Sequence, residues 1–216
     1  MPLLEALAFL FPVPCAGCGA EGRALCTGCV PGLTPVPATT ELAGVGPVTA
    51  GLAYDGVARA AVLALKEDGR AGLASALAVP FAAAVSAATP GPSVRLVAIP
   101  SSRAARRRRG FEPVRMLADR AGIRVTPLFL PARPHAVQKG LGVAERARNL
   151  DGVFALARPV DGFRVLLLDD VVTTGATLAA AAGVLRAAGA DVIGAAVLAA
   201  TPRRDGRSAG TLSRNP

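Results

Sequence analysis

Aromatic residues make up only 4% of this chain of 216 residues, and tryptophan is absent. Hydrophobic residues nevertheless account for 52% of the sequence, with alanine prominent among them. We therefore expect a core that is built from small aliphatic side chains. A chain of this length can form one sizeable domain with a small appendage.

Lysine and histidine are also rare, with Lys66, Lys139 and His135 as the only examples. The net charge of +9 therefore comes almost wholly from arginine. A strongly basic protein attracts anionic partners, either phosphorylated small molecules or nucleic acid, and charge alone does not choose between them. Because a single histidine is more often incidental than catalytic, we assign no role to His135.

No stretch has the full pattern of a secretory signal or of a membrane span. Residues 1–11 are apolar but contain Glu5 and lack a basic region. Residues 71–88 barely reach the ~18 apolar residues that indicate a span, and they include Ser75, Pro80 and Ser86. We interpret them as a buried amphipathic helix that Pro80 could interrupt, and we expect a soluble, cytoplasmic protein without a membrane partner.

The most informative stretch is residues 165–177. It begins with consecutive apolar residues, as a strand buried on both faces of a parallel sheet does, and Asp169 and Asp170 follow where that strand is expected to end. A threonine-rich turn comes next, and the Ala/Leu-rich residues 178–188 predict a helix. The order is therefore strand, acidic pair, Thr/Gly turn and helix.

This order suits a ribose phosphate. Backbone N–H groups at a helix N-terminus favour an anion, and threonine hydroxyls add hydrogen-bond donors. Gly175 lets the backbone come close to that anion, and two adjacent carboxylates are good acceptors for a pair of sugar hydroxyls. The alternative is an ordinary buried strand followed by a helix whose first turn happens to be rich in threonine.

Residues 165–177 resemble the phosphoribosyl-pyrophosphate (PRPP) motif of the type I phosphoribosyltransferases. The resemblance implies that Asp169 and Asp170 are the catalytic pair that holds the ribose 2′ and 3′ hydroxyls. Some family members carry an acid at the place of Thr173 that acts as a base on the nucleobase, and here that acid is missing. The resemblance also implies that a single turn wraps the 5′-phosphate of PRPP, formed by Thr173, Thr174, Gly175, Ala176 and Thr177.

Near the N-terminus, two C-x-x-C pairs bring together Cys15, Cys18, Cys26 and Cys29. Four thiols at this spacing suit a tetrahedral Zn²⁺ ion. Because every ligand would be a cysteine, no open coordination position would remain, so we predict a structural zinc site. Two disulfides are an alternative, but they should be reduced in the compartment that we expect. A redox-active pair is a second alternative.

Residues 31–47 have the proline, glycine and threonine content of a linker. We therefore predict a zinc-binding module with its linker at residues 1–46 and a phosphoribosyltransferase-like domain at residues 47–201. Residues 202–216 are rich in Arg, Gly and Ser, and we predict a disordered tail.

Lys66 follows a predicted strand at residues 48–54 and a predicted helix at residues 57–65. Two roles are open to it. Lys66 could bind pyrophosphate, or it could end the helix in solvent, where a cation suits the helix dipole.

Residues 94–99 predict the next strand, and five arginines within seven positions follow it. A loop directly after a parallel strand lies at the carboxyl edge of the sheet, on the same rim as the acidic pair, where ligands of open α/β sheets bind. We therefore predict that Ser101, Ser102 and Arg103 contact the pyrophosphate. A solvated basic face and a nucleic-acid patch are the alternatives for this arginine run.

Residues 133–148 mix basic, polar and glycine residues without clear periodicity, which is typical of a lid that closes over a charged ligand. Within this lid we assign Gln138, Lys139 and Arg146 to the ligand. The remaining elements that we predict are a helix at 112–121 and strands at 123–126, 153–156 and 191–199.

From about residue 11 to residue 200, the chain resembles the ComF family of phosphoribosyltransferase-like competence proteins. The resemblance implies an α/β fold, with a Rossmann-like type I phosphoribosyltransferase core and a zinc-bearing N-terminal module. It also implies a role in DNA uptake during natural transformation, with proteins of the uptake machinery as partners. Members often have Asn-Gln after Arg-Gly-Phe, where this chain has Glu112-Pro113. The features that carry the resemblance are the four cysteines, Lys66, Arg109-Gly110-Phe111, Gln138-Lys139, Arg146, Asn149 and the PRPP motif.

Three functions are compatible with these features. An enzyme would bind PRPP with Mg²⁺ and transfer the phosphoribosyl group to a nitrogen nucleophile, with release of pyrophosphate. A binding module would sense PRPP or a nucleotide without turnover and act through a protein or DNA partner. Direct DNA binding by the cysteine module is weakly supported, because residues 15–29 contain only Arg23 as a cation and no aromatic residue for base stacking.

Overall fold

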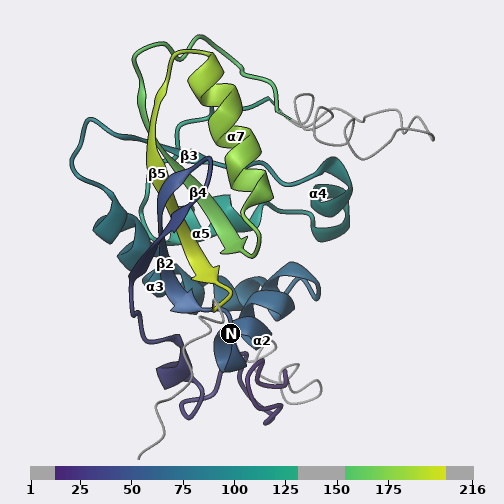
Figure 1. Ribbon diagram of the computed structural model, residues 1–216. Coiled ribbons are helices and arrows are strands. Elements are labelled where there is room, and N and C mark those ends of the chain that lie inside the picture. The colour runs from purple at the N-terminus through teal and green to yellow at the C-terminus, as the bar shows by residue number, and fades with distance from the viewer. Residues whose placement is uncertain (1–12, 131–153, 203–216) are drawn as a thin grey trace, which may run out of the picture.

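The computed structural model describes residues 13–130 and 154–202 of the chain (Figure 1). In these residues a five-stranded sheet has the order β1-β2-β5-β4-β3. The antiparallel pair is β1 and β2, and all other neighbouring strands are parallel. The elements are η1 (Val30–Leu33), β1 (Ala38–Leu42), β2 (Gly46–Ala53), α2 (Gly56–Lys66), η2 (Ala71–Leu73), α3 (Ala74–Ala88), β3 (Arg95–Ala98), α4 (Arg103–Arg109), α5 (Pro113–Arg120), β4 (Arg164–Val172), α7 (Ala176–Ala187) and β5 (Asp191–Ala200).

The sheet is covered by helices on both faces. Leu166 and Leu168 of β4 pack with residues of α2, α3 and α5, whereas Val165 and Leu167 pack with α7. Both faces of β4 are therefore buried, which explains why the first part of the strand is an unbroken run of apolar residues. Figure 1 shows α7 on one side of the sheet and α3 and α5 on the other. The fold is the α/β arrangement that we predicted from the sequence.

Helix α3 belongs to the core. By length and composition alone, residues 71–88 could cross a membrane. In the structure Leu77 and Phe81 are fully buried against the sheet. The predicted interruption at Pro80 is wrong, because α3 runs through this residue. Gly51 of β2 lies directly opposite, so the Pro80 backbone occupies the space that a side chain on β2 would need.

Three further predictions differ from the structure. The proline-rich stretch that we interpreted as a linker contains β1, an edge strand that pairs with β2 along its whole length. Residues 123–126, predicted as a strand, are not regular; Thr126 makes one backbone hydrogen bond to Leu96, and Pro127 then follows. Of the predicted strand at 153–156, the described residues 154–156 form only an isolated bridge between Phe129 and Leu156.

The N-terminal cysteine segment packs on the face of the sheet that α2, α3 and α5 cover. Leu33 of η1 lies in the same buried cluster as α2 and α3. Gly32 faces Val57 of α2 so closely that an added Cβ atom would lie 2.8 Å from the Val57 Cβ. The Arg70 guanidinium donates hydrogen bonds to the carbonyl oxygens of Pro14 and Ala24. The segment is thus attached to the start and the end of α2. The domain boundaries after residues 46 and 201 stay predictions.

Gly51 and Gly183 offer a matched pair of alanine substitutions. A Cβ atom at Gly51 would lie 2.1 Å from the Pro80 carbonyl oxygen, so Gly51→Ala should push α3 from the sheet and lower the free energy of unfolding by about 1–3 kcal/mol. Gly183 is exposed on α7, and an added Cβ atom would have no neighbour within 4 Å among the described residues. Gly183→Ala should therefore raise the free energy of unfolding by up to about 1 kcal/mol. Urea unfolding of both variants checks this; an unchanged or raised free energy of unfolding for Gly51→Ala would contradict the packing of α3.

Candidate functional site

The acidic pair lies on a part of β4 that has only one neighbouring strand. Strand β3 ends at Ala98, opposite Leu168, and the last backbone bond across this edge runs from the Ile99 N–H to the Leu168 carbonyl oxygen. We had expected Asp169 and Asp170 to follow the strand. Strand β4 instead continues to Val172, so both residues lie within it. Beyond Leu168 the β3 side of β4 is open, and the carboxylates line a cavity there.

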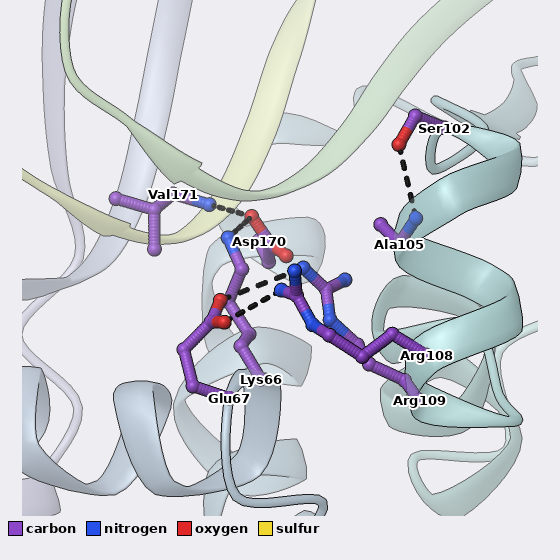
Figure 2. Close-up of polar contacts among 8 residues, drawn as sticks. All are labelled: Lys66, Glu67, Ser102, Ala105, Arg108, Arg109, Asp170 and Val171. Atoms are coloured by element: carbon purple, nitrogen blue, oxygen red, sulfur yellow. Dashed lines mark hydrogen bonds and ion pairs between the residues drawn. The ribbon is translucent and has the colours of Figure 1, made fainter.

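Asp170 forms an ion pair with Lys66, the last residue of α2. The Lys66 Nζ lies 3.0 Å from Asp170 Oδ1, and both side chains are largely buried. The same carboxylate oxygen accepts a hydrogen bond from the Val171 N–H at 2.7 Å. Figure 2 shows the Lys66 side chain reaching from the end of α2 to the end of β4. Of the two roles left open for Lys66, the structure excludes the solvated helix end.

The environment of Asp169 shifts its pKa. Desolvation, followed by the neighbouring Asp170 charge, raises the pKa of Asp169 from 3.8 to about 7. The Asp170 N–H, which donates to Asp169 Oδ1 at 2.8 Å, and the Lys66 charge act in the opposite direction. A carboxyl group with this pKa gains and loses its proton near neutral pH, so its acceptor strength depends on pH in the physiological range.

The Thr/Gly turn forms a small open hollow at the start of α7. Gly175 has φ of 78°, the left-handed conformation that glycine adopts readily, and it immediately precedes the helix. Leu42 at the end of β1 packs behind it, since an added Cβ atom at Gly175 would lie 2.2 Å from Leu42 Cδ2. The hollow of about 40 Å³ is lined by Asp169 and the whole predicted turn: Thr173, Thr174, Gly175, Ala176 and Thr177.

The hollow continues into a larger cavity of about 420 Å³, because Asp169, Val171 and Thr177 line both. This cavity also contains Lys66 and the loop after β3, including Ser101 and Ser102. The structure therefore brings together the predicted acidic pair, the predicted turn, Lys66 and the two serines. These segments are far apart in the sequence but meet at the carboxyl edge of the sheet.

The serines and Arg103 differ in what they offer to the cavity. The Ser102 Oγ caps α4 by accepting the Ala105 N–H at 3.2 Å (Figure 2). The Ser101 N–H donates to Glu112 Oε2 at 3.1 Å. Arg103 is not among the residues that line the cavity of the acidic pair; it lines an adjoining cavity of about 110 Å³ that shares Ser101 with it. Its predicted contact with pyrophosphate stays a prediction without support from this placement.

Arg109 and Glu67 are the residues that our sequence reasoning did not single out as ligand contacts. The Arg109 side chain lines the cavity, is only 9% exposed, and lies with its Nη2 atom 3.7 Å from Glu67 Oε1. Arg108 Nη2 lies 2.6 Å from the other carboxylate oxygen of Glu67. Figure 2 shows both guanidinium groups converging on Glu67, next to the Lys66–Asp170 pair. The sequence signals at this position are the Arg109-Gly110-Phe111 run of the resemblance and Gly110, which ends α4, but neither identifies Arg109 as a ligand contact.

The four cysteines form one cluster. Their sulfur atoms all lie within 4.8 Å of one another. The Cys26 N–H, 3.3 Å from Cys15 Sγ, lowers the pKa of Cys15 to about 6, whereas hydrogen bonding with the Cys26 side chain raises the pKa of Cys29 to about 12. Gly17 is required beside them, because an added Cβ atom would lie 2.7 Å from Cys29 Sγ. Four clustered sulfurs with backbone donors are the donor set that zinc prefers, so the cluster is consistent with a zinc site.

The predicted lid lies outside the described residues. This applies to Gln138, Lys139 and Arg146, and also to His135 and Asn149. Their assignment to a ligand stays a prediction.

Comparison with known proteins links the chain to one family. The profile of the phosphoribosyl transferase domain matches residues 71–212. An adenine phosphoribosyltransferase of Parafrankia sp. (strain EAN1pec) is 40% identical over 113 residues, which cover 48% of this chain and 57% of the relative. The DNA utilization protein YhgH of Escherichia coli (strain K12) is 43% identical over 61 residues, or 28% of this chain and 27% of the relative. The chain spans about half the length of the adenine phosphoribosyltransferases that it matches.

The raised pKa of Asp169 predicts a pH-dependent stability. The unfolded chain releases this proton near pH 4, but the folded chain holds it up to about pH 7, so the wild-type fold loses stability as the pH rises between these values. Asp169→Asn removes that loss and can still accept the Asp170 N–H. We expect the variant to melt at a higher temperature than the wild type at pH 8, by a margin that shrinks toward pH 5. The exposed Asp191, changed to asparagine, is the control; a margin for Asp169→Asn that is constant with pH would contradict the assignment.

Proposed function

This chain belongs to the phosphoribosyl transferase domain family, and on that premise we propose that it binds PRPP with Mg²⁺ and transfers the phosphoribosyl group to a nitrogen nucleophile. In this reaction the bond from ribose C1 to pyrophosphate breaks and pyrophosphate leaves with the electron pair. A bond from C1 to nitrogen forms, and the nitrogen gives up a proton. The observation that carries the proposal is that the acidic pair, the Thr/Gly turn and Lys66 lie along one continuous cavity.

In the proposed complex, each part of the cavity binds one part of PRPP. Asp169 and Asp170 accept hydrogen bonds from the ribose 2′ and 3′ hydroxyls, which fixes the sugar while positive charge develops at C1. The N–H groups and hydroxyls of residues 173–177 donate to the 5′-phosphate at the start of α7. Lys66 at the opposite end, together with Arg109, supplies positive charge for the pyrophosphate. Ser101 and Ser102 line the same cavity.

The oxygen-rich lining of the cavity fits Mg²⁺. This ion prefers oxygen ligands and is usually held by one or two carboxylates together with substrate phosphates, which Asp169, Asp170 and PRPP would provide. When bound, Mg²⁺ neutralises the charge of the departing pyrophosphate. The residues of the chain then have to orient the ribose and exclude water from C1.

The transfer reaction also needs an acceptor for the proton of the nitrogen nucleophile. A threonine hydroxyl, such as that of Thr173, does not accept a proton at neutral pH, so the proton of the nucleophile has to go to another acceptor. This feature favours a second candidate function, in which the protein senses PRPP or a nucleotide without turnover and acts through a partner. Release of pyrophosphate separates the two candidates.

A role in DNA uptake, as in the ComF family, is our proposal for the biological context. The local similarity to a DNA utilization protein supports it, as does the combination of a four-cysteine cluster with a phosphoribosyl transferase domain. We propose a cytoplasmic protein that acts with proteins of the uptake machinery. The exposed arginines of α4 leave direct DNA contact as an alternative.

The ligands that we propose for structural zinc are Cys15, Cys18, Cys26 and Cys29. The cluster lies on the segment that packs against both ends of α2, and α2 carries Lys66 into the cavity. Zinc would hold this segment folded and thereby support the helix that ends at the cavity.

Removal of both carboxylates should abolish tight PRPP binding. Each carboxylate-to-hydroxyl bond contributes about 1.5–3 kcal/mol, so Asp169→Asn with Asp170→Asn should weaken binding by at least about 100-fold. Calorimetry with PRPP and Mg²⁺ measures this, with Asp191→Asn as the control that removes a carboxylate from the amino end of β5. Unchanged affinity in the double variant would contradict the site.

The same protein should release pyrophosphate when PRPP, Mg²⁺ and the right acceptor from a panel of nucleobases and amines are supplied. PRPP binding without release across the panel would favour the sensing function.

Removal of the proposed metal should unfold the N-terminal segment. We expect the purified protein to contain stoichiometric zinc by elemental analysis, and Cys26→Ser to lose it. A strong chelator should lower the melting temperature of the wild type and leave that of Cys26→Ser, already lowered, unchanged. Full stability in the absence of zinc, with all four thiols free, would argue against a structural metal.

A further inference from the structure

Glu67 occupies a position between the cavity and the arginine-rich helix α4. It follows Lys66 directly and caps the C-terminus of α2, where its own N–H donates to the Leu63 carbonyl oxygen. Its two carboxylate oxygens serve different partners. Oε2 lies 2.6 Å from Arg108 Nη2, and Oε1 lies 3.7 Å from Arg109 Nη2 (Figure 2).

Helix α4 has little else to hold it in place. No residue between Arg103 and Arg109 is fully buried. In Figure 1 the helix stands to one side of the sheet. The Ser102 cap and the left-handed Gly110 define its two ends but make no contact with the sheet through these features. Among the described residues, the two ion pairs with Glu67 connect α4 to the end of α2.

Arg109 is the arginine of α4 that enters the cavity of the acidic pair. Its side chain is about nine-tenths buried, and its Nε atom has no hydrogen-bond partner among the described residues. A buried guanidinium nitrogen without a partner is costly, which points to an anionic ligand that completes its bonding. Glu67 contacts the Nη2 atom of the group, and the Nε atom is left without a partner among the described residues.

We propose that Glu67 is a positioning residue for pyrophosphate: it fixes α4 against the end of α2 and thereby holds Arg109 beside Lys66 at the end of the cavity. This inference rests on the proposed function, because it takes the pyrophosphate of PRPP as the ligand of Lys66 and Arg109. Glu67 itself does not touch the ligand. It acts by fixing the distance between two cations that come from different helices.

The direction in which Glu67→Gln changes the affinity for pyrophosphate tests this role. Glu67 carries a negative charge close to a site for an anion, so by charge alone its removal should strengthen pyrophosphate binding. If Glu67 positions Arg109, its removal frees α4 and should weaken binding instead. The two physical effects therefore predict opposite changes for Glu67→Gln.

Calorimetry with Mg²⁺-pyrophosphate, PRPP and ribose 5-phosphate measures the effect on each part of the site. We expect Glu67→Gln to weaken pyrophosphate and PRPP binding by about 10-fold or more, the loss of one charge-assisted contact, and to leave ribose 5-phosphate within about twofold of the wild type. Asp68→Asn is the matched control, because it removes the same charge from the exposed neighbouring residue. We expect this control to bind pyrophosphate at least as tightly as the wild type.

Arg109 provides the second variant. If Glu67 acts through Arg109, Arg109→Ala should weaken pyrophosphate binding at least as much as Glu67→Gln, and the double variant should bind no worse than Arg109→Ala alone. Additive losses would overturn the proposal. Melting curves verify that each variant is folded.

The outcomes separate this proposal from the proposed function. Wild-type binding of PRPP, with Glu67→Gln binding pyrophosphate as tightly as the wild type or more tightly, overturns the role of Glu67 alone. An equal loss of ribose 5-phosphate affinity also overturns it, because it would indicate general damage. A wild type that binds neither PRPP nor pyrophosphate overturns both proposals.

Discussion

Two carboxylates at consecutive positions of a buried strand have to be compensated, and this requirement organises the candidate site. Asp169 and Asp170 repel each other at the point where β4 leaves the cover of β3. Lys66 compensates Asp170 directly, whereas desolvation, followed by the Asp170 charge, raises the pKa of Asp169. The cation comes from α2, so the orientation of this helix determines the electrostatics of the pair. The cysteine segment packs on α2 near both of its ends. The N-terminal segment and the site are therefore mechanically connected through one helix.

Sequence reasoning identified the parts of the fold whose signal is local. The apolar runs of β4 and β5 and the Ala/Leu-rich α7 could be predicted because burial on both faces of the sheet and helix propensity act within a few residues. Strand β1 was missed because its pairing with β2 provides the stabilisation, while its flanking prolines favour a linker. Residues 123–126 have strand-like composition, but Pro127 ends the pairing with β3 after a single bond.

The same division applies to the site. The acidic pair and the Thr/Gly turn are contiguous in the sequence, so their joint lining of one hollow could be predicted. The choice of arginine could not. Arg103 and Arg109 are six residues apart on α4, so they project about 120° from each other around the helix axis, and only the packing of α4 against Glu67 decides which of them enters the cavity. Contacts of this kind join residues from separate helices and leave no pattern in the sequence.

The unliganded cavity is close to electrically balanced, and this affects how an anion would bind. Lys66 is engaged by Asp170, and Arg109 shares Glu67 with Arg108. A polyphosphate competes with these carboxylates for the cations, which costs energy unless the carboxylates gain new partners. Ribose hydroxyls and Mg²⁺ are suitable partners for Asp169 and Asp170, whereas Glu67 keeps its contacts with Arg108 and Arg109 and needs no new partner. The geometry thus favours a ligand that brings a diol, a metal ion and a diphosphate together over a free anion, because only the combined ligand satisfies every group that it displaces.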